Sequence, residues 1–210
     1  MENLEEKLFV SRETLSDLRI YQTLLTDWQN KFNLVSNSSL QDAWSRHFLD
    51  SAQLYQYIPK NTVNLIDFGS GAGFPALVLA TMSKKRTPYL NITAVESIKK
   101  KTLFLKEVCS RLNLQVRIEN NRIENLKPQK YDVITSRAMC SLDKLLDYAQ
   151  NFCHKNTTCI FPKGQSYESE LMLAKKKYSF DCEIKENMLS EDGKILIITN
   201  IKNKKGERNA

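Results

Sequence analysis

Three glycines at alternate positions, Gly69, Gly71 and Gly73, are the residues of this sequence best suited to hold a ligand. Glycine tolerates positive φ angles and has no Cβ, so the backbone around it can turn sharply and come close to a bound molecule. Asp67 stands two residues before the first glycine. Glu96 follows Gly73 by about the 20 residues that, in related α/β folds, separate a glycine-rich turn from the acid that binds ribose hydroxyls. These residue types and spacings predict a nucleotide-binding site.

The glycines lie between an expected strand and an expected helix. Residues 63–68 are apolar and β-prone, and residues 76–82 are apolar and helix-like, which predicts strand, tight turn and helix. The free N–H groups at the start of that helix add to the same binding site. A second strand over residues 90–95 ends at Glu96. The alternative is a glycine-rich turn in an unrelated α/β protein, with Glu96 beside a helix N-cap, and the order of these features disfavours it.

The remaining patterns complete an α/β fold. Helices are expected over residues 3–31, with a second start at Ser11, and over about 40–57, ending before Pro59. Further helices are expected at 99–112, 141–152 and 166–177, and further strands at 114–119, 131–136, 157–161, 178–185 and 195–201. This order is typical of the Rossmann-like class I fold of S-adenosylmethionine (SAM)-dependent methyltransferases. That fold is a seven-stranded, mostly parallel sheet ending in an antiparallel hairpin, here with N-terminal helices.

We expect three parts along the chain. Residues 1–60 form a helical extension packed on the core, because no linker rich in proline, serine or glycine follows them. Residues 61–201 form the SAM-dependent methyltransferase domain. Residues 202–210 form a basic, flexible tail.

Composition fits a soluble chain of this size. Its 210 residues, 41% of them hydrophobic, are enough for a sizeable core, and no apolar run approaches the ~20 residues of a membrane span. The acidic start of the chain lacks the basic and apolar segments of a signal peptide. Five cysteines without a C-x-x-C pair, and only two histidines, argue against a disulfide framework or a metal site and for a reducing compartment. We therefore expect a cytoplasmic monomer without a bound metal or a membrane partner.

The net charge of +7 is unevenly distributed. Residues 1–40 hold four basic and six acidic side chains, so the remainder of the chain carries +9. Basic residues cluster at 84–86, 99–101, 175–177 and 202–208. Such clusters suit a polyanionic partner. Solvated helix ends and a lysine-rich composition would produce the same pattern.

Short blocks spread over about residues 27–201 carry a closer resemblance. They are Asn30-Lys31-Phe32-Asn33-Leu34, Arg46-His47-Phe48-Leu49-Asp50-Ser51, the glycine block from Asp67 to Pro75, Glu96-Ser97, Lys99-Lys100-Lys101, Phe104-Leu105, Arg122-Ile123-Glu124, Ser136-Arg137-Ala138 and Lys163-Gly164. Together they are similar to the bacterial RsmG family, also called GidB. Members of that family make 7-methylguanosine in the 530 loop of 16S rRNA. Ala76 replaces a glycine common in the family, which is a small-for-small change.

The resemblance implies a SAM site, with S-adenosylhomocysteine as the product and no metal. The residues it implies for this site are Gly69, Gly71, Gly73, Phe74, Glu96, Ile123, Glu124 and Arg137. It also implies that the partner is 16S rRNA, in the 30S subunit or its precursor. Glu124 taken alone also fits a solvent-facing acid at the start of a helix.

Four residues are candidates for contact with RNA or for positioning the reactants. Arg137 follows a strand, and its guanidinium can hold a carboxylate or phosphate by two hydrogen bonds, although position alone fits a surface salt bridge equally well. The i, i+4 spacing places Arg46 and Asp50 on one helix face within reach of His47, for RNA or cofactor contact or for an internal salt bridge and a packed histidine. Lys163 is either an RNA contact or a solvated charge. We assign Arg137 and Lys163 to positioning in catalysis, and Arg46, His47 and Lys163 to RNA binding.

The chain lacks the catalytic motifs of other methyltransferase classes, and this agrees with the chemistry expected of this family. N7 of guanine has a lone pair and no proton, so its attack on a sulfonium methyl group needs alignment and no general base. Residues 135–138 lack the proline motif of enzymes that methylate amino groups of DNA, and Cys140 lacks the Pro-Cys setting of a cytosine carbon-5 nucleophile. Phe74, Phe161 and Trp44 are candidates for stacking on an exposed base, although such residues are more often core.

Three other functions stay open from the sequence. A SAM-dependent methyltransferase for a protein or small molecule would explain the glycines and Glu96 and leave the basic clusters incidental. A nucleic-acid-binding protein with a degenerate, inactive fold is disfavoured because the glycines and Glu96 are intact. An NAD-dependent oxidoreductase is disfavoured by the G-x-G-x-G spacing and by the terminal hairpin.

Overall fold

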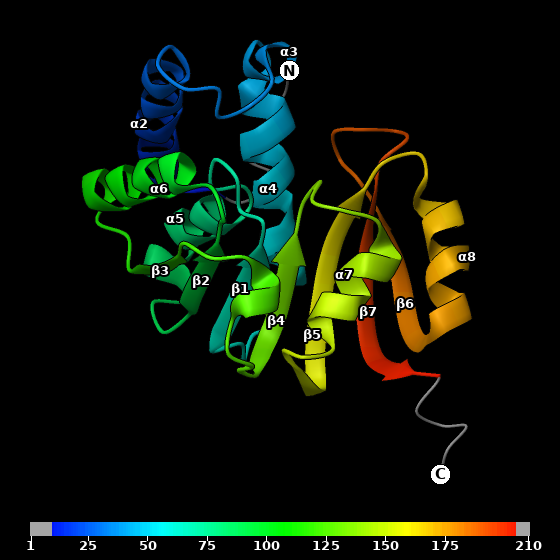
Figure 1. Cartoon of the computed structure of the whole chain (residues 1–210). Helices are drawn as coiled ribbons and strands as arrows, with labels where there is room; N and C mark the ends of the chain where they lie inside the picture. The colour runs from blue at the N-terminus through cyan, green and yellow to red at the C-terminus, as the bar shows by residue number, and fades with distance from the viewer. Residues whose placement is uncertain (1–9, 205–210) are drawn as a thin grey trace.

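Seven strands form one mixed sheet in the computed structural model, which describes residues 10–204. The strands are β1 (Asn64–Phe68), β2 (Asn91–Val95), β3 (Val116–Glu119), β4 (Tyr131–Ser136), β5 (Cys153–Lys163), β6 (Tyr178–Glu186) and β7 (Lys194–Asn203). They lie in the order β3-β2-β1-β4-β5-β7-β6 (Figure 1). The first five are parallel, and β7 is antiparallel to both β5 and β6. The expected parallel sheet with a terminal antiparallel hairpin is confirmed.

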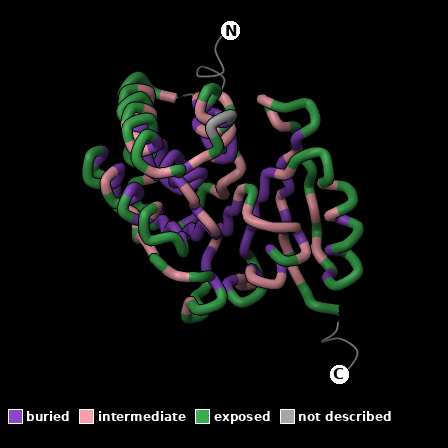
Figure 2. Tube along the Cα trace, turned by 45° about the horizontal axis from the view of Figure 1, so that its top comes forward, coloured by how far each residue is buried: buried purple, intermediate pink, exposed green. Residues whose placement is uncertain are grey.

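Helices cover both faces of the sheet. They are α2 (Arg12–Gln29), α3 (Asn37–Leu40), α4 (Asp50–Ala52), α5 (Ala76–Arg86), α6 (Lys99–Leu112), α7 (Leu142–Ala149) and α8 (Tyr167–Lys177). Successive strand residues point to opposite faces, so Leu65 joins the core under α2, α5 and α6, whereas Ile66 joins the core under α7 and α8. Buried residues accordingly follow the central strands and the inner sides of the helices (Figure 2).

Helix α2 contributes directly to one of these cores. The side chain of Ser11 caps it by accepting a hydrogen bond from the N–H of Thr14 (3.2 Å), which confirms the expected helix start. Leu18, Tyr21 and Leu25 recur at helical spacing and are fully or almost fully buried. The part of the expected first helix that precedes residue 10 lies outside the described residues.

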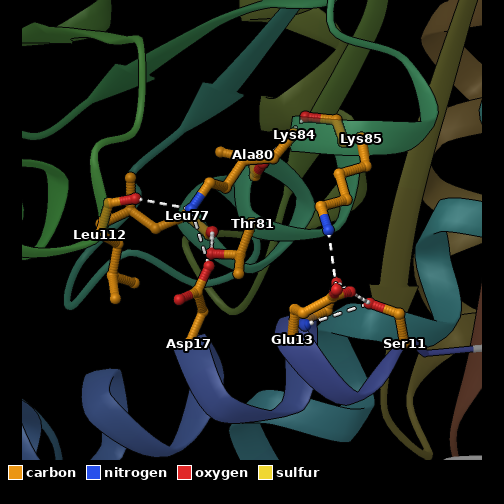
Figure 3. Close-up of polar contacts among 11 residues, drawn as sticks. Ser11, Glu13, Asp17, Leu77, Ala80, Thr81, Lys84, Lys85 and Leu112 are labelled. Carbon is orange, nitrogen blue, oxygen red and sulfur yellow. Dashed lines mark hydrogen bonds and ion pairs between the residues drawn. The ribbon is translucent and has the colours of Figure 1, made fainter.

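Ion pairs join α2 to α5, and a hydrogen bond joins α5 to α6 (Figure 3). The ammonium group of Lys84 donates to Asp17 Oδ2 and to the carbonyl of Leu112, both at 2.8 Å. Lys85 pairs with Glu13 at 2.9 Å. The first basic cluster of the sequence is therefore largely matched by the acidic N-terminal segment, and this match accounts for two of its three charges.

The segment expected as one helix over residues 40–57 is instead a series of short turns. A π-helix at Trp44–Leu49 is followed by α4 and then by a 3₁₀ helix at Gln53–Tyr57. The N–H of Asp50 donates to the carbonyl of Ser45, which is the wider i→i−5 bond of a π turn.

Two strand boundaries also differ from expectation. β5 begins at Cys153 instead of residue 157, and its pairing with β4 shifts between Tyr131↔Cys153 and Val133↔Thr158, so that an irregular stretch separates its two paired parts. β7 continues to Asn203, so residues 202–203 pair with β6 and do not belong to the tail. Residues 205–210 lie outside the described part of the chain.

Candidate functional site

Side chains from other elements pack closely against the glycine turn after β1. Gly69, Gly71 and Gly73 have φ angles of 68°, 60° and 94°, which disfavour any side chain. A Cβ on Gly69 would lie 2.8 Å from Cγ of Met139, and a Cβ on Gly73 would overlap the hydroxyl of Tyr21. Backbone conformation therefore favours glycine at all three positions, and lack of space for a Cβ adds to this requirement at Gly69 and Gly73.

A buried carboxyl group lies beneath the turn. Asp67 accepts hydrogen bonds from Ser70 Oγ (2.6 Å) and from Thr135 Oγ1 (2.8 Å) and has no exposed surface. Burial raises the pKa of Asp67 to about 7, and the two hydroxyl donors and the charge of Arg137 oppose this rise. Asp67 thus ties the turn to the neighbouring strand β4.

Glu96 closes the other side of the turn. Its Oε2 accepts from the N–H of Gly71 (2.9 Å) and its Oε1 accepts from the N–H of Ile98 (2.7 Å). Glu96 also lines a cavity of about 370 Å³, the glycine-turn cavity, together with Gly69, Gly71, Ile98, Lys101, Arg122, Ile123, Glu124 and Met139. Each carboxylate oxygen keeps one lone pair, so the two oxygens can accept from a pair of vicinal hydroxyls of a ligand.

The 3₁₀ turn Ile123–Asn125 after β3 forms the far wall of this cavity. Ile123 is buried, whereas Glu124 is exposed and accepts a hydrogen bond from the hydroxyl of Tyr148 in α7 (2.9 Å). A flat apolar wall beside a polar rim suits a nucleobase. Both residues stand where the sequence places them, at the glycine-turn cavity.

Gly73 and Phe74 do not line that cavity. Phe74 is 3% exposed, and its ring stacks on Tyr21 (centroids 5.5 Å apart) and on His47 (4.9 Å), with Phe48 at its edge (5.1 Å). The hydroxyl of Tyr21 donates a hydrogen bond to the carbonyl of Ala72. This aromatic cluster supports the turn from the side of α2.

Arg137 is anchored to the π-helix segment. Its Nη1 donates to the carbonyl of Arg46 (2.7 Å) and pairs with Asp50 Oδ2 (3.4 Å), and its Nη2 donates to Nδ1 of His47 (2.8 Å). The guanidinium also lies over the ring of Phe74, 5.2 Å from its centroid. Burial lowers the pKa of Arg137, and the carboxylate of Asp50 opposes this effect. Arg46 therefore meets Arg137 through its backbone carbonyl, not through its charge.

His47 is held in its neutral form. Burial lowers its pKa to about 4, and the charges of Arg137 and Arg46 act in the same direction. Because Arg137 donates to Nδ1, the proton of the neutral ring is on Nε2. Nε2 is buried and has no hydrogen-bond partner within residues 10–204. His47 is therefore a packed and oriented histidine with one unused donor.

A larger cavity of about 850 Å³ opens beside Arg137, between the π-helix, the ends of β4 and β5, and the loop before β7. Among the residues that line it are Arg46, His47, Asp50, Arg137, Met139, Lys163 and Gly164. The side chain of Lys163 is 8% exposed, and its ammonium group pairs with Glu170 (2.8 Å) and donates to the carbonyl of Cys140 (2.9 Å). Lys163 is thus a wall of this large cavity and not a solvated charge.

The expected site residues fall into three groups. Gly69, Gly71, Glu96, Ile123 and Glu124 line the glycine-turn cavity; Arg46, His47, Arg137 and Lys163 line the large cavity; Gly73 and Phe74 line neither. Of the other aromatic candidates, Phe161 is fully buried in the sheet, and Trp44 carries the guanidinium of Arg19 3.6 Å from its ring centroid.

Sequence reasoning missed two residues of the site. Met139 lines both cavities and lies between them, and the preceding residue, Ala138, has a φ of 51°, which is unusual for a residue with a Cβ. In the sequence, Met139 could be recognised as a site residue only from its position directly after Ser136-Arg137-Ala138. Nothing in the sequence indicated Tyr21, because its hydrogen-bond partner Ala72 is 51 residues away.

Two negative findings concern the described residues. Within residues 10–204, no group of three or more His, Cys, Asp and Glu side chains is arranged to hold a metal ion. No helix of this part of the chain is sufficiently long and apolar to span a membrane.

The strand order, the glycine turn after β1 and the acid after β2 define the fold of the class I SAM-dependent methyltransferases. Two solved structures share it: a ribosomal protein L11 methylase from Lactobacillus delbrueckii subsp. bulgaricus (TM-score 0.58, 13% identity, 72% of this chain and 76% of that chain) and M. jannaschii TYW2 in complex with AdoMet (TM-score 0.54, 16% identity, 76% and 78%).

Sequence comparison identifies the family within that class. The family model described as rRNA small subunit methyltransferase G matches residues 14–198. A ribosomal RNA small subunit methyltransferase G from Jannaschia sp. (strain CCS1) is 41% identical over 89% of this chain and 89% of its own length. The chain belongs to the rRNA small subunit methyltransferase G (GidB) family, as its sequence blocks indicate.

Proposed function

We propose that this protein methylates N7 of a guanine in the 530 loop of 16S rRNA, in the cytoplasm, with SAM as the methyl donor. The observation that carries the proposal is the meeting of two cavities at Met139 in a chain of this family. One cavity has the groups needed for a nucleoside-containing donor. The other, at about 850 Å³, is large enough for an extruded base.

The glycine-turn cavity is proposed to hold SAM. The two oxygens of Glu96 are already oriented by the N–H groups of Gly71 and Ile98, so they can accept from both ribose hydroxyls without rearrangement. Ile123 offers an apolar wall for the adenine, and Gly69 allows a close approach of the backbone. Gly73 and Phe74 would contribute indirectly, because they pack against Tyr21 and support the turn.

The large cavity is proposed to hold the guanine. SAM supplies an electrophilic methyl group on a sulfonium. The N7 lone pair forms the new N–C bond while the S–C bond breaks and its electron pair returns to sulfur. No proton leaves N7, so the positive charge passes to the base and no general base is required.

The polar groups of the large cavity agree with a role in positioning. His47 is neutral, and its Nδ1 is occupied by Arg137. The carboxylates of Asp50 and Glu170 are paired with Arg137 and Lys163. Such fixed pairs can orient a base and tolerate the charge that it gains, and alignment accounts for much of the catalysis expected here. The exposed side chain of Arg46, at the rim of the cavity, suits an RNA phosphate.

The test is the modification state of 16S rRNA. Mass-spectrometric mapping in cells that lack this protein is expected to show the loss of one 7-methylguanosine in the 530 loop. The wild-type gene restores it, and Gly71→Asp does not, because that residue needs a φ of 60° and its N–H holds Glu96.

A matched control keeps this result specific. Lys155→Gln changes an exposed residue that contributes to neither the glycine-turn cavity nor the large cavity, and it is expected to restore the modification fully. An unchanged profile in the deletion strain would contradict the rRNA proposal. Transfer of a labelled methyl group to a protein or small molecule instead would support the alternative acceptor class.

A further inference from the structure

Two sequence blocks that the proposed site does not use meet in the structure. The loop Lys31–Leu34 after α2 and the start of α6 line a cavity of about 370 Å³, the Phe32 cavity. Its lining is Lys31, Phe32, Asn33, Leu34, Ile98, Lys100 and Lys101. The cavity therefore combines an aromatic ring, an exposed isoleucine and several lysines from segments almost 70 residues apart.

The loop that carries Phe32 is held in place by one buried side chain. Oε1 of Gln29 accepts from the N–H groups of Leu34 (2.8 Å) and Val35 (3.1 Å), and its Nε2 donates to the carbonyl of Val35 (2.9 Å). The ring of Phe32 packs beside Trp28, with centroids 5.7 Å apart. The loop is therefore fixed before any ligand arrives, and one part of Phe32 stays accessible.

The lysines at the start of α6 differ from three lysines of the other clusters, although Lys175 and Lys176 also form no ion pair in the described part of the chain. Lys84 and Lys85 are matched by Asp17 and Glu13, and Lys177 is matched by Asp143 (3.2 Å). By contrast, within residues 10–204 no carboxylate forms an ion pair with Lys99, Lys100 or Lys101. Lys100 lies over the ring of Phe32, 5.1 Å from its centroid.

Local stability does not explain these lysines. They occupy the first turn of α6, where the positive end of the helix dipole disfavours cations. Ile98 beside them is 50% exposed. Unmatched cations around an apolar, aromatic hollow complement a nucleotide, which offers a flat base face and phosphates.

The Phe32 cavity is also next to the proposed reaction site. It shares Ile98 and Lys101 with the glycine-turn cavity, which shares Met139 with the large cavity. The three cavities thus follow one another along the carboxyl edge of the sheet. A strand of RNA with its target base in the large cavity would extend past the cofactor toward Phe32.

We propose that the Phe32 cavity binds an unpaired nucleotide of the substrate RNA, at a distance from the methylated guanine. The base stacks on Phe32 and Ile98. Lys31 and Lys100 of the lining, with the exposed Lys99 beside them at the start of α6, contact the adjoining phosphates, and Lys100 moves off the ring. This inference rests on the proposal that the substrate is RNA. Unpaired RNA bases are commonly recognised by such stacking, which does not depend strongly on sequence.

The test compares two pairs of charge changes in the full-length protein. Lys99→Gln/Lys100→Gln is expected to weaken binding of 16S rRNA about tenfold at low salt and to reduce the slope of log Kd against log salt by about 1 to 2. The control Lys175→Gln/Lys176→Gln makes the same charge change at exposed positions on α8, at the far end of the sheet, and is expected to leave both values near wild type.

Changes at Phe32 separate stacking from charge. Phe32→Leu is expected to weaken rRNA binding about tenfold without changing the salt slope, whereas Phe32→Tyr keeps an aromatic face and is expected to retain affinity. Thermal unfolding shows whether Phe32→Leu folds, and the Tyr variant tests the ring if it does not.

The outcomes distinguish this proposal from the proposed function. If the wild type methylates rRNA and the Lys99/Lys100 and Phe32→Leu variants bind it like wild type, the Phe32 subsite is wrong and the function stands. Equal losses in both lysine pairs would also overturn it, since the effect would be one of net charge. If the wild type neither binds nor methylates rRNA, the function itself fails. Binding of anionic vesicles or an acidic peptide, but not RNA, would assign the cavity to another partner.

Discussion

Asp67 and His47 are buried groups whose responses to acid oppose each other. Burial raises the pKa of Asp67 from 3.8 to about 7, so the folded chain binds this proton more tightly than the unfolded chain, and stability falls as pH rises through that window. Burial lowers the pKa of His47 from 6.5 to about 4, so the unfolded chain binds that proton more tightly, and stability falls as pH decreases through that window. The two contributions partly cancel between about pH 4 and 6.5.

Single substitutions are expected to separate the contributions of Asp67 and His47 to the pH dependence of stability. Relative to wild type, Asp67→Asn should lose stability more steeply as pH falls from 6.5 to 4.5, by up to about 1.4 kcal/mol per pH unit. His47→Gln should shift the slope in the opposite direction. Urea unfolding across this range measures both, with Asp27→Asn as the control because Asp27 is exposed. An Asp67→Asn profile parallel to that of wild type would show that Asp67 does not titrate in this window.

Met139 is the third residue whose role can be tested. Its side chain is the one lining element common to the glycine-turn cavity and the large cavity, and it packs on Gly69. Met139→Ala should widen the passage and loosen the alignment of donor and acceptor, which we expect to lower kcat about 10- to 100-fold. SAM affinity should change by less than about threefold, because Glu96 and Ile123 remain. Met139→Leu is the volume-matched control and should stay near wild type. Wild-type kcat in the alanine variant would exclude this role.

At the scale of elements, the π-helix determines what Arg137 can contact. The wide turn brings the carbonyl of Arg46, the ring of His47 and the carboxylate of Asp50 to one guanidinium at the end of β4. Asp50 further accepts from Gln53 and Asn187, both at 2.9 Å. The π-helix segment, β4 and the loop before β7 are therefore linked around the large cavity, which favours a rigid cavity wall.

Helix α2 and the glycine turn are joined by Tyr21. Tyr21→Phe removes the hydrogen bond to the carbonyl of Ala72 and leaves that carbonyl buried and unpaired, so we expect a loss of about 1–3 kcal/mol in the free energy of unfolding. SAM affinity should fall as well, because Ala72 lies within the turn. Tyr89→Phe is matched in chemistry, since Tyr89 donates to the carbonyl of Lys60 (2.8 Å), but Tyr89 is 51% exposed and should lose less than about 0.5 kcal/mol. Urea unfolding and calorimetric SAM titration measure the two effects, and equal losses in both variants would contradict this role of Tyr21.

At the scale of the whole molecule, the N-terminal segment and the sheet share one core. Both tryptophans of the chain, Trp28 and Trp44, lie in that segment, and Trp28 contacts Phe104 of α6 (5.5 Å). We therefore expect urea unfolding followed by tryptophan fluorescence to coincide with unfolding followed by far-ultraviolet circular dichroism. An earlier fluorescence transition would show that residues 1–60 unfold as a separate unit, against the proposed packed extension.

Charge also becomes interpretable only at this scale. The clusters at 84–86 and 175–177 look alike in sequence to the cluster at 99–101. In the fold, α2 supplies carboxylates to the first and α7 supplies them to Lys177. The cluster at 99–101 faces a hollow instead. A lysine run therefore predicts a binding surface only once its packing partners are known.

The sequence by itself determined the sheet, the glycine turn and Glu96. These features depend mainly on neighbours in the chain: short apolar, β-prone runs specify the buried strands, and positive φ requires glycine. An acid at the end of a strand reaches the preceding turn when the two strands are adjacent. The seven-stranded sheet with its terminal antiparallel hairpin and the position of Glu96 at the turn agree with those expectations.

Only the tertiary structure decided the environment of the remaining site residues. Arg137 meets Arg46, His47 and Asp50 across 87 to 91 positions of the chain, and Lys163 is occupied by Glu170 in α8. The π turn and the burial of Phe74 against α2 likewise follow from packing between distant segments. Spacing along the chain encodes local conformation, whereas the partner of a buried charge or ring depends on which segments the sheet order and the shared core bring together.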